Sequence, residues 1–444
     1  MRSPLESARL RRILLAFTVN RLGGWFGLVA LLVLVFDHTH DALAVSALLL
    51  AWQALPAFVV PALVARVEAS KRGGELSGLY LIEAVATAAL AVLVWHFWLP
   101  GVLILAAIDG TAALAASALL RAELARAARE EAGALAAGAH VGEEQEARAQ
   151  EAERKANAAL NIAFSATFVV GPALGGLVVA GPGVATALFI DVGSFVLCAA
   201  LLTDLHPHVE QAGVDSVRAR LRAAWQYVGE RVALRKLLLV YAVALAMFET
   251  AAPIEVAFAK ETLHAGDRGL GLLFTCWGAG AVLGSLAFAR LHRRPLALML
   301  SAGTLAIGVA DGGFALAPTL TVACGAAIVG GAGNGVELPA LVSLVQQVAP
   351  SHMHGRLMGA VEALTAFAVA IGLALGGTLV ALTSTRVAFA AVAAATAVVA
   401  AVLLSLGRRG GDLAVDDGDQ QSETLDAQAD RAAPSPLRVL AEDP

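Results

Sequence analysis

The stretch Gly171-Pro-Ala-Leu-Gly-Gly-Leu-Val-Val-Ala180 occurs again 201 positions later, as Gly372-Leu-Ala-Leu-Gly-Gly-Thr-Leu-Val-Ala381. Seven of the ten positions are identical, and each copy lies inside a long apolar run. A repeat at nearly half the chain length indicates that the sequence consists of two similar halves. Halves of this kind, embedded in apolar sequence, are typical of membrane proteins with internal symmetry. The sequence therefore predicts a duplicated structure.

The composition places the chain in a lipid bilayer. Hydrophobic residues make up 58% of the chain and charged residues 15%, whereas soluble domains have about 45–50% and about 25%. A membrane helix needs about 20 mainly apolar residues, and twelve segments between residues 13 and 406 meet that requirement. We therefore expect an all-α integral membrane protein with twelve transmembrane helices in two pseudo-symmetric six-helix bundles.

The distribution of arginine predicts the orientation of the chain. The connections between the apolar segments alternate between basic and nearly charge-free, and the N-terminal segment with Arg11 and Arg12 is one of the basic ones. Basic loops stay in the cytoplasm, so both termini are expected there. The scarcity of lysine beside arginine and the abundance of alanine indicate a bacterial source. We therefore expect a multi-pass protein of the bacterial cytoplasmic membrane.

Polar segments divide the chain into its expected parts. An Ala-, Glu- and Arg-rich stretch interrupts the first half and is typical of a helical cytoplasmic extension. The central linker has apolar residues at helical spacing opposite arginines, which favours an interfacial helix. The expected parts are an N-terminal half at 1–203 with its extension at 122–156, the linker at 204–235, a C-terminal half at 236–407, and a disordered cytoplasmic tail at 408–444.

No pattern for catalysis, cofactor binding or metal binding is visible. The cysteines Cys198, Cys276 and Cys324 lie in apolar runs without metal-ligand spacing, which is typical of small buried apolar residues. There is no phosphate-binding loop ending in Gly-Lys-Ser or Gly-Lys-Thr, and no concentrated basic surface that would bind nucleic acid. We therefore expect neither an enzyme nor a bound metal or cofactor.

Three further phrases resemble those of a known family. They are Asn157 through Gly176 followed by Phe189-Ile-Asp191, then Gly333-Asn-Gly335, and then Gln346-Gln-Val-Ala-Pro350 followed by Gly355-Arg-Leu-Met358. In this order and spacing they are similar to the major facilitator superfamily, and more narrowly to bacterial exporters of enterobactin and drugs. The resemblance covers about residues 10–407. It implies that the first, fourth, seventh and tenth spans line a central cavity, and it associates the Gly-Pro-x-x-Gly-Gly phrase with antiport.

The loop after the second span departs from the family pattern. It reads Pro61-Ala-Leu-Val-Ala-Arg66, so Ala65 stands where the family has an aspartate that helps to latch the cytoplasmic gate. Ala289 likewise precedes Arg290 in the second half. The usual latch is therefore not carried over to this chain. The cytoplasmic gate residues that the resemblance implies are Arg66, Arg290, Gly355 and Arg356.

The repeated phrase also predicts a helix-packing motif. Glycines let a partner helix approach closely in lipid, where packing drives association, and proline removes a backbone hydrogen bond. Such a helix either seals one half against the other or makes ordinary small-residue contacts, and the sequence leaves both open. The motif residues are Gly171, Pro172, Gly175, Gly176, Gly372, Gly376 and Gly377.

Charged side chains within the predicted spans are the candidate functional residues, because intramembrane charge is costly and usually faces a cavity or a partner. They are Arg21, Glu83, Asp109, Asp191, Glu249, Glu255, Asp311, Glu337 and Glu362. Asp109 and Glu337, with Glu249 next, are expected to carry protons, since a carboxyl group in an apolar cavity can load and release one. Arg21 is expected to hold a neighbouring carboxylate, first of all Asp109. The alternative for each is a structural pair or a place near a helix end. Asn20 and Asn334 lie on the same expected cavity helices.

The resemblance and the buried charges together predict a secondary active transporter that works by alternating access. Proton-coupled export of a small amphipathic compound, drug-like or siderophore-like, is the preferred interpretation. The alternatives are an uptake symporter or facilitator on the same fold, a transporter of lysophospholipid-type lipids, and a non-transporting membrane scaffold. The expected partners are the small-molecule substrate, protons and the bilayer, and a monomer is expected.

Overall fold

The computed structural model describes residues 7–60, 75–135, 143–203, 222, 225–291, 293–348 and 354–408. Within these ranges the regular elements are all helices, and twelve helical segments are long and apolar enough to cross a membrane. The predicted all-α fold with twelve spans is therefore confirmed.

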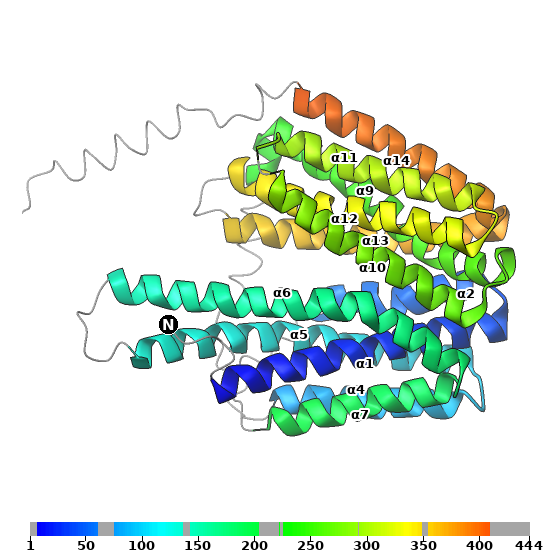
Figure 1. Cartoon of the computed structure of the whole chain (residues 1–444), viewed down its shortest axis with the longest axis horizontal. Helices are drawn as coiled ribbons and strands as arrows, with labels where there is room; N and C mark the ends of the chain where they lie inside the picture. The colour runs from blue at the N-terminus through cyan, green and yellow to red at the C-terminus, as the bar shows by residue number, and fades with distance from the viewer. Residues whose placement is uncertain are drawn as a thin grey trace, which may run out of the picture.

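The described helices fall into two sets of six spans, which form separate bundles (Figure 1). The first bundle contains α1 (Ala8–Thr39), α2 (Ala42–Leu49) with the π-helical turn η1 (Leu50–Ala54), α4 (Glu75–Leu93), α5 (Leu99–Leu135), α6 (Glu143–Ala180) and α7 (Val184–Leu201). The second contains α9 (Val232–Ala257) with the π-helical turn η2 (Phe258–Thr262), α10 (Gly266–Arg290), α11 (Leu296–Leu316), α12 (Leu320–Val348), α13 (His354–Leu382) and α14 (Thr385–Arg408).

Local sequence explains the sharp turn between α1 and α2. His40 ends α1 in the left-handed conformation, with φ 48°, and its N–H donates to the carbonyl of Phe36. Asp41 then caps α2, because its side chain accepts a hydrogen bond from Leu43 N at 2.8 Å. The left-handed C-cap and the acidic N-cap satisfy backbone groups that the helix ends would otherwise leave unpaired.

The glycines of the repeated phrase have the same two roles in both halves. Gly175 lies against α1, where a Cβ atom would come within 3.1 Å of the Trp25 carbonyl oxygen, and Gly376 lies against α9, where it would come within 3.0 Å of Pro253. The next glycine faces the other bundle: Gly176 lies against Gly271 of α10. In each copy, therefore, the first of the two adjacent glycines contacts a helix of its own half, and the second contacts a helix of the other half.

Gly377 makes the matching contact in the second half. Its N–H donates to the hydroxyl of Ser46 on α2 at 3.0 Å, and a Cβ atom there would lie 2.7 Å from the Ala42 carbonyl oxygen. The boundary where α2 meets α13 and α6 meets α10 is called the seam below. A larger side chain at Gly377 or Gly176 has no room in the seam as the structure holds it.

At one end of the molecule the buried apolar side chains of both halves form a single cluster, and at the other end each half has a cluster of its own. One cluster joins Val33 of α1 and Val45 of α2 to Ile254 of α9 and Leu373 of α13, so it spans both halves. This end, where α1 turns into α2, is called the closed end. At the opposite, divided end, a cluster around Ile13 and the other members of the first half is separate from a cluster confined to the second half.

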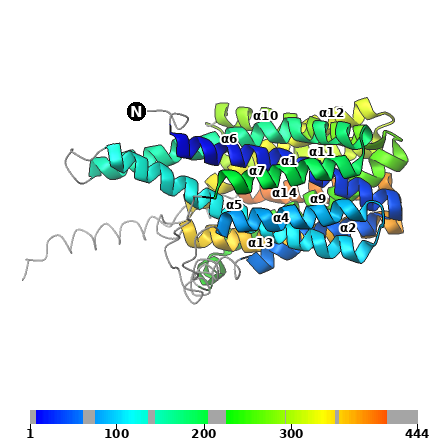
Figure 2. The same ribbon diagram turned by 90° about the horizontal axis from the view of Figure 1, so that it is seen from below.

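Helices α5 and α6 extend beyond the bundle at the divided end (Figure 2). The predicted extension 122–156 covers the end of α5 and the start of α6, and 136–142 lies outside the described ranges. The two extended parts are joined by an ion pair between Arg129 Nε and Glu153 Oε2 at 2.7 Å.

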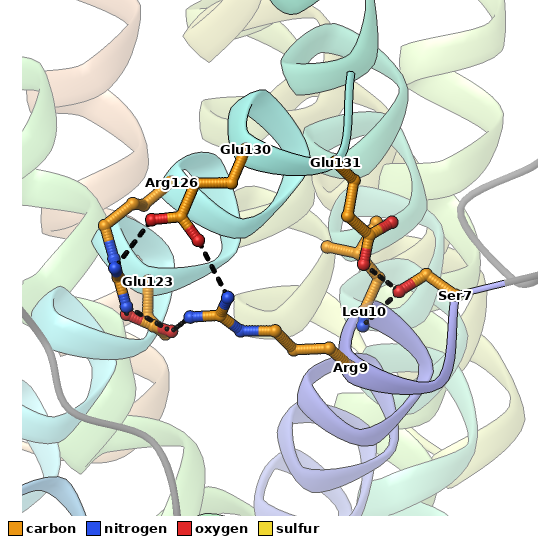
Figure 3. A network of polar contacts seen from close by, with 7 residues as sticks. All are labelled: Ser7, Arg9, Leu10, Glu123, Arg126, Glu130 and Glu131. Carbon is orange, nitrogen blue, oxygen red and sulfur yellow. Dashed lines mark hydrogen bonds and ion pairs between the residues drawn. The ribbon is translucent and has the colours of Figure 1, made fainter. Parts of the chain in front are cut away.

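The start of α1 is anchored on the extension of α5 (Figure 3). Arg9 contacts Glu123 at 2.5 Å and Glu130 at 2.8 Å, and Arg126 pairs with the same two carboxylates. The Glu123 side chain is fully buried, so the two guanidinium groups compensate its charge. Buried charges of this kind need such partners.

Parts of the expected organisation lie outside the described residues. The loop with Arg66 and the tail from residue 409 onward are among them. Of the linker at 204–235, the structure describes Arg222 and residues 225–235, in which 225–230 form a helical turn and Val232 begins α9.

Candidate functional site

Asp109 is held inside the first half by neutral donors. It lies on α5 and is almost fully buried. Its carboxylate accepts hydrogen bonds from Trp52 Nε1 of η1 and from Thr87 Oγ1 of α4, each at 3.0 Å. Three spans therefore converge on one carboxyl group that has polar contacts but, among the described residues, no ion pair.

Glu337 occupies a similar setting in the second half. It lies on α12, is almost fully buried, and accepts a hydrogen bond from Thr304 Oγ1 of α11 at 2.6 Å. In each half, then, a carboxyl group on the fourth span is bonded by a threonine on the third. The depths differ, because Asp109 comes ten residues after the start of α5 and Glu337 seventeen after the start of α12. At a rise of 1.5 Å per residue, Glu337 therefore lies about 10 Å farther along its helix toward the divided end than Asp109 does.

Glu249 lies at the seam. Its carboxylate on α9 accepts a hydrogen bond from Gln53 Nε2 of η1 at 3.4 Å, so the contact joins the two halves. On the other side Glu249 packs against α13, where a Cβ atom on Gly372 would lie 2.8 Å from its own Cβ. Of the three predicted proton carriers, Glu249 is thus the one with a hydrogen bond from the opposite half.

Arg21 does not pair with Asp109, contrary to expectation. Its guanidinium carbon lies 5.6 Å from the ring centroid of Phe17 and 5.4 Å from that of Phe164. Within the described residues the carboxylate that attracts it electrostatically is Glu83 of α4. Arg21 therefore lies beside aromatic rings of α1 and α6, whose faces stabilise its charge.

Two other acidic residues have no hydrogen-bond partner among the described residues. They are Glu83 on α4 and Asp311 on α11, and in each of them both carboxylate oxygens are buried without a hydrogen-bond donor. Asp191 of α7 accepts from Ser194 at 3.2 Å and fills the space beside Gly23 and Gly27 of α1. Ionised carboxylates without partners are costly in an apolar interior, so Glu83 and Asp311 differ from the hydrogen-bonded Asp109 and Glu337.

The remaining predicted residues are less informative. Asn20 on α1 and Asn334 on α12 are half-buried, and Arg290 ends α10 in an exposed position. Gly355 and Arg356 belong to the first turn of α13. The sequence gives no signal for the hydrogen-bond donors of these carboxylates, because neutral side chains in apolar spans stand out only once the helix faces are known. These donors are Trp52, Gln53, Thr87 and Thr304.

A polar pocket at the closed end was also not foreseen. Lys260 of η2 forms ion pairs with Asp37 at the end of α1 and with Asp267 at the start of α10, the latter at 2.7 Å. The first pair crosses from one half to the other. The pocket has a volume of about 340 Å³ and is lined by Phe36, Asp37, His40, Lys260, Glu261, His264 and Gly266.

Known proteins resemble this chain in sequence and in fold. The family model described as Major Facilitator Superfamily matches residues 237–444. The fold of the solved nucleoside transporter NupG superposes with a TM-score of 0.66 over 90% of this chain and 99% of that chain, at 13% sequence identity. A bacterial homologue of the human lysosomal transporter Spinster, in an inward-facing and unoccupied conformation, superposes with a TM-score of 0.61 over 90% and 98%, at 14% identity. The second half of the chain thus matches the model of that superfamily, and the likeness to the two solved structures is one of fold.

Curated proteins are similar to this chain in sequence as well. The "Multidrug efflux pump Tap" of Mycolicibacterium fortuitum is 28% identical over 267 residues, which are 57% of this chain and 63% of that protein. An "Uncharacterized MFS-type transporter YfiS" of Bacillus subtilis is 27% identical over 237 residues, 50% of this chain and 56% of that protein. The chain thus spans less than two thirds of the length of these relatives. Twelve helices among the described residues are apolar and long enough to cross a membrane, as in a multi-pass membrane protein.

The described ranges contain no group of three or more His, Cys, Asp or Glu side chains that could hold a metal ion.

Proposed function

We propose that this protein is a proton-coupled exporter of small amphipathic compounds that works by alternating access. The observation that carries the proposal is the apolar core, which is one cluster at the closed end and two clusters at the divided end. Two rigid halves that are joined by a common core at only one end can rotate against each other about the seam. The first end then opens while the other end closes. Such rocking exposes a site between the halves to each side in turn.

The proposed orientation puts the divided end in the cytoplasm. The N-terminal segment with its arginines and the charged extensions of α5 and α6 lie at this end, and basic segments stay in the cytoplasm. Both termini are then cytoplasmic and the structure corresponds to the inward-facing state. The ion pair of Lys260 with Asp37 closes the external end in this state.

Three carboxyl groups are proposed to couple transport to protons. Asp109, Glu249 and Glu337 lie on the fourth, seventh and tenth spans, and each accepts a hydrogen bond from a neutral side chain. A neutral donor does not fix the charge of a carboxyl group as an arginine would, so a proton can be taken up and released. Glu249 is placed to respond to movement of the halves, because its donor belongs to the other half.

Export of amphipathic compounds is supported by the relatives named multidrug efflux pump, and on this chain it remains our proposal. The test uses inside-out membrane vesicles with an acidified lumen, in which the lumen corresponds to the outside of the cell. Adding ethidium or another amphipathic dye should release protons from the lumen while the dye accumulates. Vesicles with Asp109→Asn should lose both signals. Dye entry that leaves the luminal pH unchanged would favour a facilitator and overturn the coupling.

A further inference from the structure

The π-helical turn η1 carries two neighbouring side chains that reach two of the candidate proton carriers. Trp52 donates to Asp109 in its own half at 3.0 Å, and the next residue, Gln53, donates to Glu249 in the other half at 3.4 Å. Consecutive residues of a helix point about 100° apart, so one turn faces both carboxyl groups. π-Helical turns within α-helices occur frequently at functional sites.

The turn is also fixed to the helix that carries Asp109. Gly110 follows Asp109 on α5 and lies directly under the carbonyl of Trp52, so closely that a Cβ atom there would overlap the carbonyl carbon and oxygen. The same Cβ atom would lie 3.1 Å from Pro56, just after the turn. Because the backbone of the turn rests on the residue next to Asp109, the carboxyl group and the turn cannot shift independently.

The duplicated fold supplies an internal comparison. Trp277 of α10 places its carbonyl on Gly331 of α12 as Trp52 does on Gly110. In the second half, however, Gly330 stands where Asp109 precedes Gly110, and the Trp277 ring lies over Gly330. Helix α10 is α-helical throughout. The tryptophan-on-glycine contact is therefore common to both halves, whereas at this place in the fold only the first half has the carboxylate and a π-helical turn.

We propose that η1 links the proton on Asp109 to the contact between the halves, with Trp52 and Gln53 as positioning residues. The link rests on the proposed function, in which Asp109 and Glu249 carry protons. A hydrogen bond from the Trp52 indole to an ionised carboxylate is stronger than one to a neutral acid. When Asp109 takes up a proton, the turn is held less firmly and Gln53 can withdraw from Glu249. The seam then loses a contact and the halves can separate.

Linkage makes the effect reciprocal. If the proton on Asp109 changes the equilibrium between the two conformers, the conformer must change how firmly Asp109 holds its proton. The contact through Gln53 is the structural route between them, because it is the hydrogen bond from η1 to the second half.

The test measures conformers and needs no substrate. Spin labels at Pro182 and Ser384, exposed residues at the closed ends of the two halves, report their separation by pulsed electron resonance. In the otherwise unaltered protein the fraction of separated closed ends should rise as the pH falls. Trp52→Phe keeps an aromatic side chain but removes the N–H donor. It should reduce this pH response about threefold or more, because a hydrogen bond to a charged group is lost. Trp277→Phe is the matched control and should leave the response intact.

A second pair of variants keeps the test decisive if Trp52→Phe fails to fold. Gln53→Leu should also flatten the response. Gln53→Glu should reverse it, because two ionised carboxylates at the seam repel each other at high pH and a proton shared between them restores the contact as the pH falls. An unchanged pH response in both Gln53 variants, or in Trp52→Phe, overturns the link. Loss of dye-coupled proton release in the unaltered protein instead overturns the proposed function, so the two failures are distinguishable.

Discussion

The ion pair between Lys260 and Asp37 should set the balance between inward-facing and outward-facing conformers. Lys260→Gln removes the ion pair that joins η2 of the second half to the end of α1. The Lys260 side chain is 11% exposed and the Asp37 side chain 48%. The pair is thus half-solvated, and such pairs are worth about 1 kcal/mol or less. A loss of about 1 kcal/mol raises the ratio of outward-facing to inward-facing molecules about fivefold.

The distribution of distances between spin labels at Pro182 and Ser384 measures that ratio, in protein without the three native cysteines. Asp37→Asn should match Lys260→Gln, because it removes the same contact between the halves. Asp267→Asn is the control: it removes the other ion pair of Lys260, at 2.7 Å, which lies within the second half. The shift should shrink at high salt, which screens exposed pairs.

Two outcomes would refute the reasoning. One is a shift in Asp267→Asn as large as the shift in Asp37→Asn, since the effect would then not come from the contact between the halves. The other is an exchange variant, Asp37→Lys with Lys260→Asp, that stays shifted although the pair can form again.

Further variants test the close packing at the seam, the buried charge of Glu123 and the carboxyl group of Asp109. Gly176→Leu should destabilise the inward-facing state by about 1–3 kcal/mol, as overpacking does, and shift the label distances outward; Gly78→Leu, where a Cβ atom would meet nothing within 4 Å, should not. Glu123→Gln should lower the free energy of unfolding by about 1–3 kcal/mol, because two arginines lose a buried partner; Glu130→Gln, at a side chain that is 47% exposed, should cost less in the same thermal denaturation assay. Asp109→Asn should abolish the dependence of dye export on the proton gradient while dye binding, measured by fluorescence quenching, persists.

Much of the fold followed from the sequence because its signals are local. The apolar lengths gave the twelve spans, and the repeated phrase pointed to equivalent helices in two halves. The phrase also left two interpretations open, a seal between the halves or ordinary packing. The structure shows one glycine in each role, since Gly175 packs within its half and Gly176 packs across the seam.

The candidate site was less accessible from sequence because it depends on helix rotation. Asp109 and Glu337 stood out as charges in apolar spans, and both are buried as such charges tend to be. Their partners Thr87 and Thr304 carry no charge and gave no signal. The expected pairing of Arg21 with Asp109 assumed that neighbouring spans present facing side chains, yet Arg21 faces Phe17 and Phe164. The ion pair of Lys260 with Asp37 joins two turns 223 residues apart, which no local pattern indicates.

The central claim is that movement of a small molecule and movement of protons are obligatorily coupled in this chain. The most direct test imposes an ethidium gradient across reconstituted liposomes that start with equal pH inside and outside. The dye gradient alone should drive protons in the opposite direction and build a pH difference, and Asp109→Asn should abolish that pH difference. Dye that runs down its gradient with no pH difference in the unaltered protein would contradict the account.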